Sequence, residues 1–156
     1  MRILSGMKRL ALLLPLLLLA ACRGHDLARA SLYGPGTANV PIVVSTGRVV
    51  FWTQWSASFD TAAGVKDVFK AHYDVELDDG AGKAIARTTC DPRTPNEKLG
   101  GNNGRKNAPV HRESWEGRMS CDVTVPKGPY TLHVTFVIDE RPLGLVIEDA
   151  SLMARE

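Results

Sequence analysis

Hydrophobic and polar residues alternate along most of the chain after residue 40, a pattern typical of β-strands that bury one face. Residues 130–138 show it most clearly. The hydrophobic positions of this segment lie two residues apart: Tyr130, Leu132, Val134, Phe136 and Ile138. Residues 69–77 alternate in the same way, and the turn residues 78–82 lead into a returning segment at 84–90. These last two segments predict a β-hairpin.

The remaining alternating segments predict further strands. Residues 118–125 and the turn 126–129 precede the strand at 130–138, which predicts a second hairpin, and residues 145–153 would extend it to an antiparallel meander. One or two strands are expected within residues 41–55, whereas residues 61–70 fit a helix as well as a strand. Six to eight such strands predict an all-β, antiparallel two-sheet sandwich, either immunoglobulin-like or a jelly roll.

The first residues of the chain have the three parts of an export signal. Lys8 and Arg9 are positive, residues 10–19 form an apolar run, and two small residues follow it. The run has about half of the ~20 residues that a membrane-spanning helix needs. These features predict a signal peptide at residues 1–21. A short transmembrane anchor and an ordinary secretory signal are the alternatives.

The segment Leu19-Ala20-Ala21-Cys22 resembles the lipobox of bacterial lipoproteins. The resemblance implies cleavage before Cys22, a diacylglyceryl group on its sulfur and a further acyl chain, such as palmitate, on its amino group. Two or more acyl chains anchor a protein stably to a membrane. Because Arg23 rather than Asp follows the cysteine, the enterobacterial sorting rule implies the outer membrane, with the domain facing the periplasm. Residues 22–40 contain many turn-forming residues and are expected to form a tether.

The charge of the mature chain argues against a nucleic-acid partner. The full chain carries +2, but residues 1–21 contain three of the 19 basic residues and none of the 17 acidic ones, which leaves 16 against 17 and a net charge of −1. A near-neutral domain has no long-range attraction for a polyanion. With 156 residues, of which 44% are hydrophobic, the chain is expected to form a single domain over residues 41–156.

Two cysteines remain once Cys22 is lipidated. Cys90 and Cys121 form an even pair in an exported domain, which predicts a disulfide bond, with two free buried thiols as the alternative. The bridge would close the segment between them and stabilise the fold by about 3.5–4 kcal/mol in the chain-entropy description.

Residues 91–116 break the alternation and are expected to form a long loop. Such loops are usually functional or disordered, so we consider a recognition loop and an inert insertion. Between Lys98 and Arg112 the chain has four basic residues and no acidic one, which would favour an anionic partner. The candidate binding residues are Lys98, Asn102, Asn103, Arg105, Lys106, His111, Arg112 and Trp115. Trp115 is expected either to be exposed for stacking or to cover the sandwich edge.

No sequence motif for a catalytic nucleophile, a metal site or a phosphate-binding loop is found, so no catalytic residue, metal ligand or cofactor is assigned. We therefore expect a non-enzymatic envelope module that binds a protein or glycan partner through residues 91–116. The alternatives are a hydrolase that acts on a cell-wall or outer-membrane substrate, and a purely structural lipoprotein.

Overall fold

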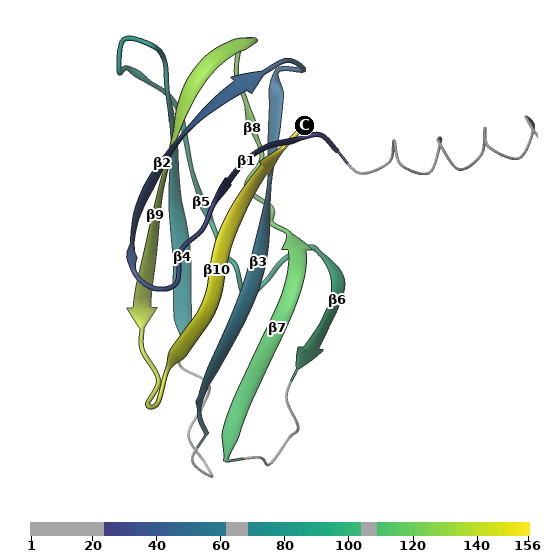
Figure 1. The fold of residues 1–156 in the computed structure, drawn as a ribbon, viewed down its shortest axis with the longest axis vertical. Helices are drawn as coiled ribbons and strands as arrows, with labels where there is room; N and C mark the ends of the chain where they lie inside the picture. The colour runs from purple at the N-terminus through teal and green to yellow at the C-terminus, as the bar shows by residue number, and fades with distance from the viewer. Residues whose placement is uncertain (1–23, 62–68, 104–108) are drawn as a thin grey trace, which may run out of the picture.

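The computed structural model describes residues 24–61, 69–103 and 109–156, apart from the side chains of residues 102 and 103. Two antiparallel sheets account for most of these residues (Figure 1). Sheet A has the order β1 (Asp26–Ala30), β10 (Val146–Arg155), β3 (Arg48–Asp60), β7 (Val110–Arg118) and β6 (Glu97–Asn103), and β8 (Val123–Thr124) pairs with the start of β3. Sheet B has the order β2 (Gly36–Val44), β9 (Gly128–Glu140), β4 (Lys70–Asp78) and β5 (Ala84–Cys90). The all-β, two-sheet prediction is confirmed. Within the described ranges, no helix is long and apolar enough to cross a membrane.

The core lies between the two sheets and is built from the alternating positions of their long strands. The odd-numbered residues of β3 from Val49 to Phe59 are buried, as are those of β4 from Ala71 to Leu77. Aromatic rings link the sheets, because Trp55 of β3 lies 6.0 Å from Phe136 of β9 between ring centroids. Burial of this apolar surface is the main stabilising contribution of the fold.

The chain connects the sheets differently from the predicted meander. The hairpin at residues 69–90 is confirmed, because β4 pairs with β5. In contrast, β9 pairs with β2 and β4, whereas β10 pairs with β1 and β3. The expected hairpin across residues 126–129 is likewise wrong, since β8 pairs with β3 instead of β9. Alternation shows which face of a strand is buried but does not say which strand lies beside it.

Two segments expected to lack regular structure contain strands. Most of residues 24–40 belong to β1 and β2, so the predicted tether at 22–40 is wrong for the described part. Residues 97–103 and 110–118 pair as β6 and β7, so the segment 91–116 is largely a two-stranded extension of sheet A. Both predictions failed because glycine-rich and polar strands at a sheet edge lack the hydrophobic alternation used to find strands.

The predicted disulfide is confirmed. Cys90 at the end of β5 is bonded to Cys121, and their Cα atoms lie 5.3 Å apart. Both residues are buried. The bond joins sheet B to the segment that follows β7, so it closes the base of the β6–β7 extension as expected.

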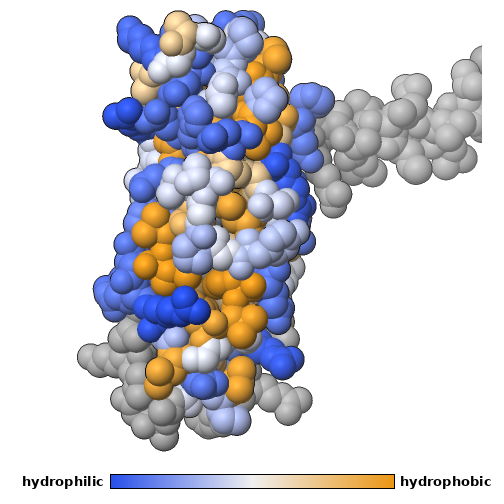
Figure 2. Space-filling view, turned by 60° about the vertical axis from the view of Figure 1, so that its left-hand side comes forward, coloured by the Kyte–Doolittle hydropathy of each residue, from blue (hydrophilic) through white to orange (hydrophobic). Residues whose placement is uncertain are grey.

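The two ends of the sandwich differ in what they carry. His25 pairs with Glu156 through backbone hydrogen bonds of 2.9 and 3.0 Å, so the start of the described chain and the C-terminus share one end, at the top of Figure 1. The end of β3 and the start of β7 lie at the opposite end, where Asp60 pairs with Val110. Figure 2, seen from the β2–β9 side, shows the larger exposed hydrophobic areas in the lower half, away from the C-terminus.

Candidate functional site

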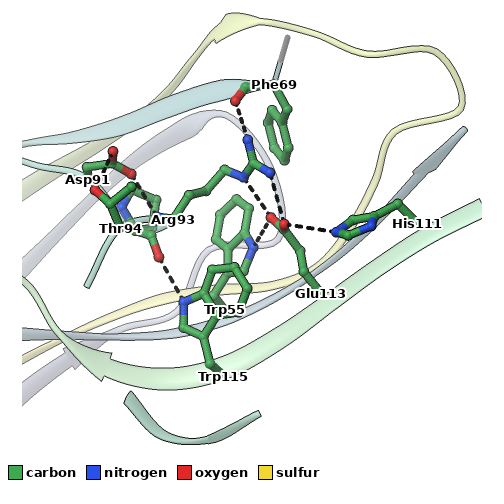
Figure 3. Close-up of polar contacts among 9 residues, drawn as sticks. Trp55, Phe69, Asp91, Arg93, Thr94, His111, Glu113 and Trp115 are labelled. Atoms are coloured by element: carbon green, nitrogen blue, oxygen red, sulfur yellow. Dashed lines mark hydrogen bonds and ion pairs between the residues drawn. The ribbon is translucent and has the colours of Figure 1, made fainter. Parts of the chain in front are cut away.

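The β6–β7 extension is held at its base by a buried ion pair (Figure 3). Arg93 donates from Nε to Oε1 of Glu113 over 2.8 Å and from Nη2 to Oε2 over 2.9 Å. Its Nη1 donates to the carbonyl oxygen of Phe69. The Glu113 side chain is 4% exposed and that of Arg93 is 15% exposed. A bidentate pair of this kind fixes both partners in orientation as well as position.

Aromatic side chains enclose this ion pair. The Arg93 guanidinium lies 4.6 Å from the ring centroid of Phe69 and 5.7 Å from that of Phe59. Trp55 donates from Nε1 to Oε1 of Glu113 over 2.7 Å. His111 lies beside Phe59 and 3.5 Å from Oε2 of Glu113. Since both carboxylate oxygens already have partners, Glu113 functions as a clamp between the sheet and the segment that enters β6.

Trp115 belongs to the same base and is not an exposed stacking residue. Its side chain is buried, with 5% exposure. It donates from Nε1 to the Pro92 carbonyl oxygen over 2.9 Å. Lys98 covers it, with Nζ 3.9 Å from the ring centroid. Of the two expectations for Trp115, the structure therefore agrees with the one in which it covers the sandwich edge.

Two glycines allow β6 to approach β7 closely. A Cβ atom at Gly117 would lie 2.6 Å from Cβ of Pro95 and 2.7 Å from the Glu97 carbonyl oxygen. A Cβ atom at Gly101, which has a φ of +135°, would lie 2.5 Å from the Ser114 carbonyl oxygen. These distances exclude a larger residue at either glycine without a shift of the backbone.

The candidate binding residues that the structure describes do not gather at one site. Lys98 and Trp115 contact each other at the base, and His111 contacts the buried pair. Asn102 and Asn103 pair with β7 through the backbone. Arg112 is exposed, and no ion-pair partner is found for it among the described residues. Arg105 and Lys106 lie outside the described residues.

A patch of exposed hydrophobic residues surrounds Arg112 at the end of β3. Ser58 of β3 pairs with Arg112 on one side and with Val146 on the other, and Asp60 pairs with Val110. Leu143 lies next to these rows, because its carbonyl oxygen accepts a hydrogen bond from the Asp60 amide. The exposed fractions are 81% for Leu143, 54% for Val146 and 41% for Val110. Val110, Arg112, Leu143 and Val146 are called the distal patch below.

A second surface lies on the outer face of sheet A, toward the end that carries Gly24 and Glu156. It is a groove of about 790 Å³ whose lining includes Val50, Trp52 and Leu99 as its larger apolar residues. Three arginines and three glutamates complete most of the lining: Arg48, Arg118, Arg155, Glu97, Glu116 and Glu156. This surface is called the Trp52 groove below.

The outer face of sheet B is polar, and its charges are largely paired with one another. Burial lowers the pKa of His72, but the hydrogen bond to Asp139 and the nearby carboxylates outweigh it and raise the pKa above the ordinary value. The hydrogen bond from Arg87 lowers the pKa of Glu76. Across the described part of the chain, no cluster of three or more possible metal ligands occurs.

Several residues of these surfaces carried no sequence signal. Arg93, Glu113 and Leu143 lie in polar segments without periodicity, and the residues that they contact are distant in the sequence. Trp52 lies on the face of β3 opposite Trp55, as the alternation of side chains along a strand requires. Neither a protein-family model nor a curated protein matches the chain.

Proposed function

We propose that the chain is a lipid-anchored envelope protein that binds another protein through the distal patch and carries out no chemical reaction itself. The observation that carries this proposal is the position of the patch. Leu143, Val146 and Val110 flank the end of β3, whereas Gly24 lies beside the C-terminal Glu156. A protein held through its N-terminus would thus present the patch on the side away from the lipid surface.

The anchor itself rests on the lipobox resemblance at Cys22. The proposal comprises removal of residues 1–21 as a signal peptide, lipidation of Cys22, and attachment to the outer membrane with the domain in the periplasm. Because β1 begins at Asp26, a short connection would separate the lipid from the folded domain. Replacement of Cys22 by Ser should abolish incorporation of labelled palmitate and release the protein from the membrane fraction. A variant that stays membrane-bound without lipid would contradict the anchor.

The chemistry of the distal patch favours a protein partner. Exposed aliphatic side chains bury apolar surface on association, which is the main favourable contribution in most protein complexes. Arg112 adds a positive charge, and the segment from Lys98 to Arg112 contains no acidic residue. A hydrophobic centre with a carboxylate opposite Arg112 is therefore the expected surface of the partner, with the charges contributing mainly to orientation and association rate.

We further propose that the sandwich is immunoglobulin-like rather than a jelly roll. The pairings β3–β7–β6 and β4–β9 correspond to B–E–D and C–F of that fold when β3 is taken as strand B. The last strand differs, because β10 lies beside β3 and not beside β9, where strand G would be. A second feature supports this assignment. Tyr130, near the start of β9, donates from its hydroxyl to the Pro126 carbonyl oxygen over 2.7 Å. The tyrosine corner of immunoglobulin-like domains has this hydrogen bond at the start of strand F.

Point substitutions test the binding proposal better than removal of the loop. Asn96 donates its backbone amide to Arg118 over 2.8 Å, so a replacement of residues 96–112 would remove an edge strand. Instead, the full-length lipidated protein should be purified from solubilised envelope with Leu143→Asp or Arg112→Glu. The expected result is loss of a stoichiometric partner, with Val43→Asp as the matched control. Unchanged partner recovery in both variants would contradict the proposal.

A further inference from the structure

The Trp52 groove has a balanced charge. Its lining contains three arginines and three glutamates. The arginines pair with two of these glutamates or with nearby aspartates, whereas Glu156 accepts hydrogen bonds from Ser45 and Thr46. Arg155 lies 3.1 Å from Glu116 and 2.6 Å from Asp26, and Arg118 lies 3.6 Å from Glu97 and 2.7 Å from Asp122. A groove of this kind does not attract a polyanion or a polycation.

The paired side chains nevertheless offer many hydrogen-bonding positions. Each guanidinium has five N–H donors in a plane, and each carboxylate has two acceptor oxygens. The pair between Arg118 and Glu97 is loose, and the side chain of Glu97 is 59% exposed. Arg118 and Glu97 can therefore satisfy a ligand that both donates and accepts, without a change in net charge. Hydroxyl groups have this property.

Apolar surface lies beside these polar groups. Trp52 is on the outer face of β3, where its ring contacts the Arg155 guanidinium at 4.8 Å from the centroid. Leu99 of β6 is 52% exposed, and Val50 lies one alternate position before Trp52 on the same face. The groove thus places an aromatic ring and two aliphatic side chains next to planar donors and acceptors. Its volume of about 790 Å³ is within the range of small-molecule sites.

From this combination we propose that the Trp52 groove binds a neutral oligosaccharide. The C–H faces of sugar rings would pack against Trp52 and Leu99, and their hydroxyl groups would bond to the Arg118 and Glu97 side chains. This site is separate from the distal patch, because Arg118 pairs with Trp52 whereas Arg112 pairs with Ser58, six residues farther along β3. The two surfaces can therefore be tested independently.

The test uses the full-length protein in a detergent without a sugar head group. An array of neutral and anionic oligosaccharides is probed first, and affinities for the bound members are then measured by titration calorimetry. We expect binding of neutral members, weakened about tenfold by Trp52→Thr. Leu99→Ser should also weaken it. Because Leu99 is exposed, this variant keeps the test valid even if Trp52→Thr does not fold. Val43→Ser, at an exposed position of sheet B, is the matched control and should bind normally.

Salt distinguishes this site from the proposed protein-binding surface. Binding of a neutral ligand should be the same at low and high sodium chloride, because no net charge is neutralised. Preference for anionic oligosaccharides, absence of binding to every neutral member, or binding unaffected by Trp52→Thr and Leu99→Ser would each overturn the proposal. None of these results bears on the partner recovery tested with Leu143→Asp.

Discussion

Two arginine–carboxylate networks lie on opposite faces of sheet A, and they differ in how far water reaches them. The Arg93–Glu113 pair faces the inside of the sandwich, where both side chains are largely buried and each Glu113 oxygen has a fixed partner. The Arg118 pairs face outward, and the side chains of Arg118 and Glu97 are 30% and 59% exposed.

The difference in exposure separates charged groups that hold the fold from charged groups that remain accessible to water or a ligand. Buried charges cannot exchange their partners without a large desolvation cost, so the inner network holds the β6–β7 extension in one arrangement. Exposed pairs contribute little to stability, and their groups can bond to water or to a ligand instead. The same chemical pairing thus fixes the fold on one face of the sheet and leaves a groove on the other.

Loss of the Glu113 carboxylate should lower the stability of the protein more than the other substitutions below. Glu113→Ala removes, in a buried place, the carboxylate that accepts hydrogen bonds from Arg93 and from the Trp55 indole N–H, so we expect a loss of about 3–5 kcal/mol in the free energy of unfolding. Urea unfolding followed by circular dichroism measures it. A loss below about 1 kcal/mol would show that the inner pair does not clamp the extension.

The disulfide is expected to contribute almost as much. The double variant Cys90→Ala and Cys121→Ala should lower the free energy of unfolding by about 2–5 kcal/mol, because the denatured chain loses a constraint across 31 residues. Unfolding in urea, with and without a reductant, measures this contribution. If reduction of the natural protein leaves its unfolding midpoint unchanged, the bond has no stabilising role.

An added side-chain atom between β6 and β7 should lower the stability by an intermediate amount. In Gly117→Ala the added methyl group meets Pro95 and the Glu97 carbonyl oxygen, so we expect a loss of about 1–3 kcal/mol. Faster amide hydrogen exchange in β6 should accompany it, while exchange in β4 stays slow. Gly80→Ala is the matched control, because a Cβ atom there meets nothing within 4 Å. Equal stability of the two variants would contradict the close packing of β6 on β7.

Substitution within the outer, exposed network should change the stability least. Glu116→Gln, on the same strand as Glu113, removes a partner of Arg155 and should change the free energy of unfolding by less than about 1 kcal/mol. Comparison of Glu116→Gln with Glu113→Gln under the same conditions isolates burial as the cause. A loss as large as that of the inner variant would remove the distinction between the two networks.

Acid should weaken one contact beside the groove. Burial alone would raise the pKa of Glu156, but hydrogen bonds from Ser45 and Thr46 outweigh it and lower the pKa below the ordinary value of 4.5. A lowered folded-state pKa stabilises the protein above the unfolded-state pKa, and this contribution is lost as the pH falls through the folded-state value. The difference in urea midpoint between the natural protein and Glu156→Gln should therefore shrink from pH 7 to pH 3. A constant difference would contradict this contribution.

Much of the sandwich could be predicted from the sequence because its central strands alternate strictly. The β4–β5 hairpin follows from such local patterns, and the Cys90–Cys121 bond followed from a single possible pairing. The edge strands β1 and β6 could not be found in this way, since Gly100 and Gly101 interrupt one and the other spans five residues.

Only part of the proposed binding surface follows from the sequence. Arg112 was identified from local charge, whereas its apolar neighbours Val146 and Leu143 come from β10 and the turn before it. Trp115 was ambiguous because a polar segment precedes it, although its partner Pro92 lies in that same segment. Contacts across 20 or more residues depend on strand register, which one sequence does not specify.

We propose that the distal patch meets a partner protein while the opposite end of the sandwich faces the membrane. A photoreactive amino acid placed at residue 143 or at residue 43 of the full-length protein in living cells tests this arrangement directly. Leu143 and Val43 are both strongly exposed, at 81% and 67%, and Val43 lies beside His25 at the N-terminal end. We expect a discrete protein adduct from residue 143, reduced by Arg112→Glu, and no such adduct from residue 43. The same adduct from both positions, or none from residue 143, would contradict it.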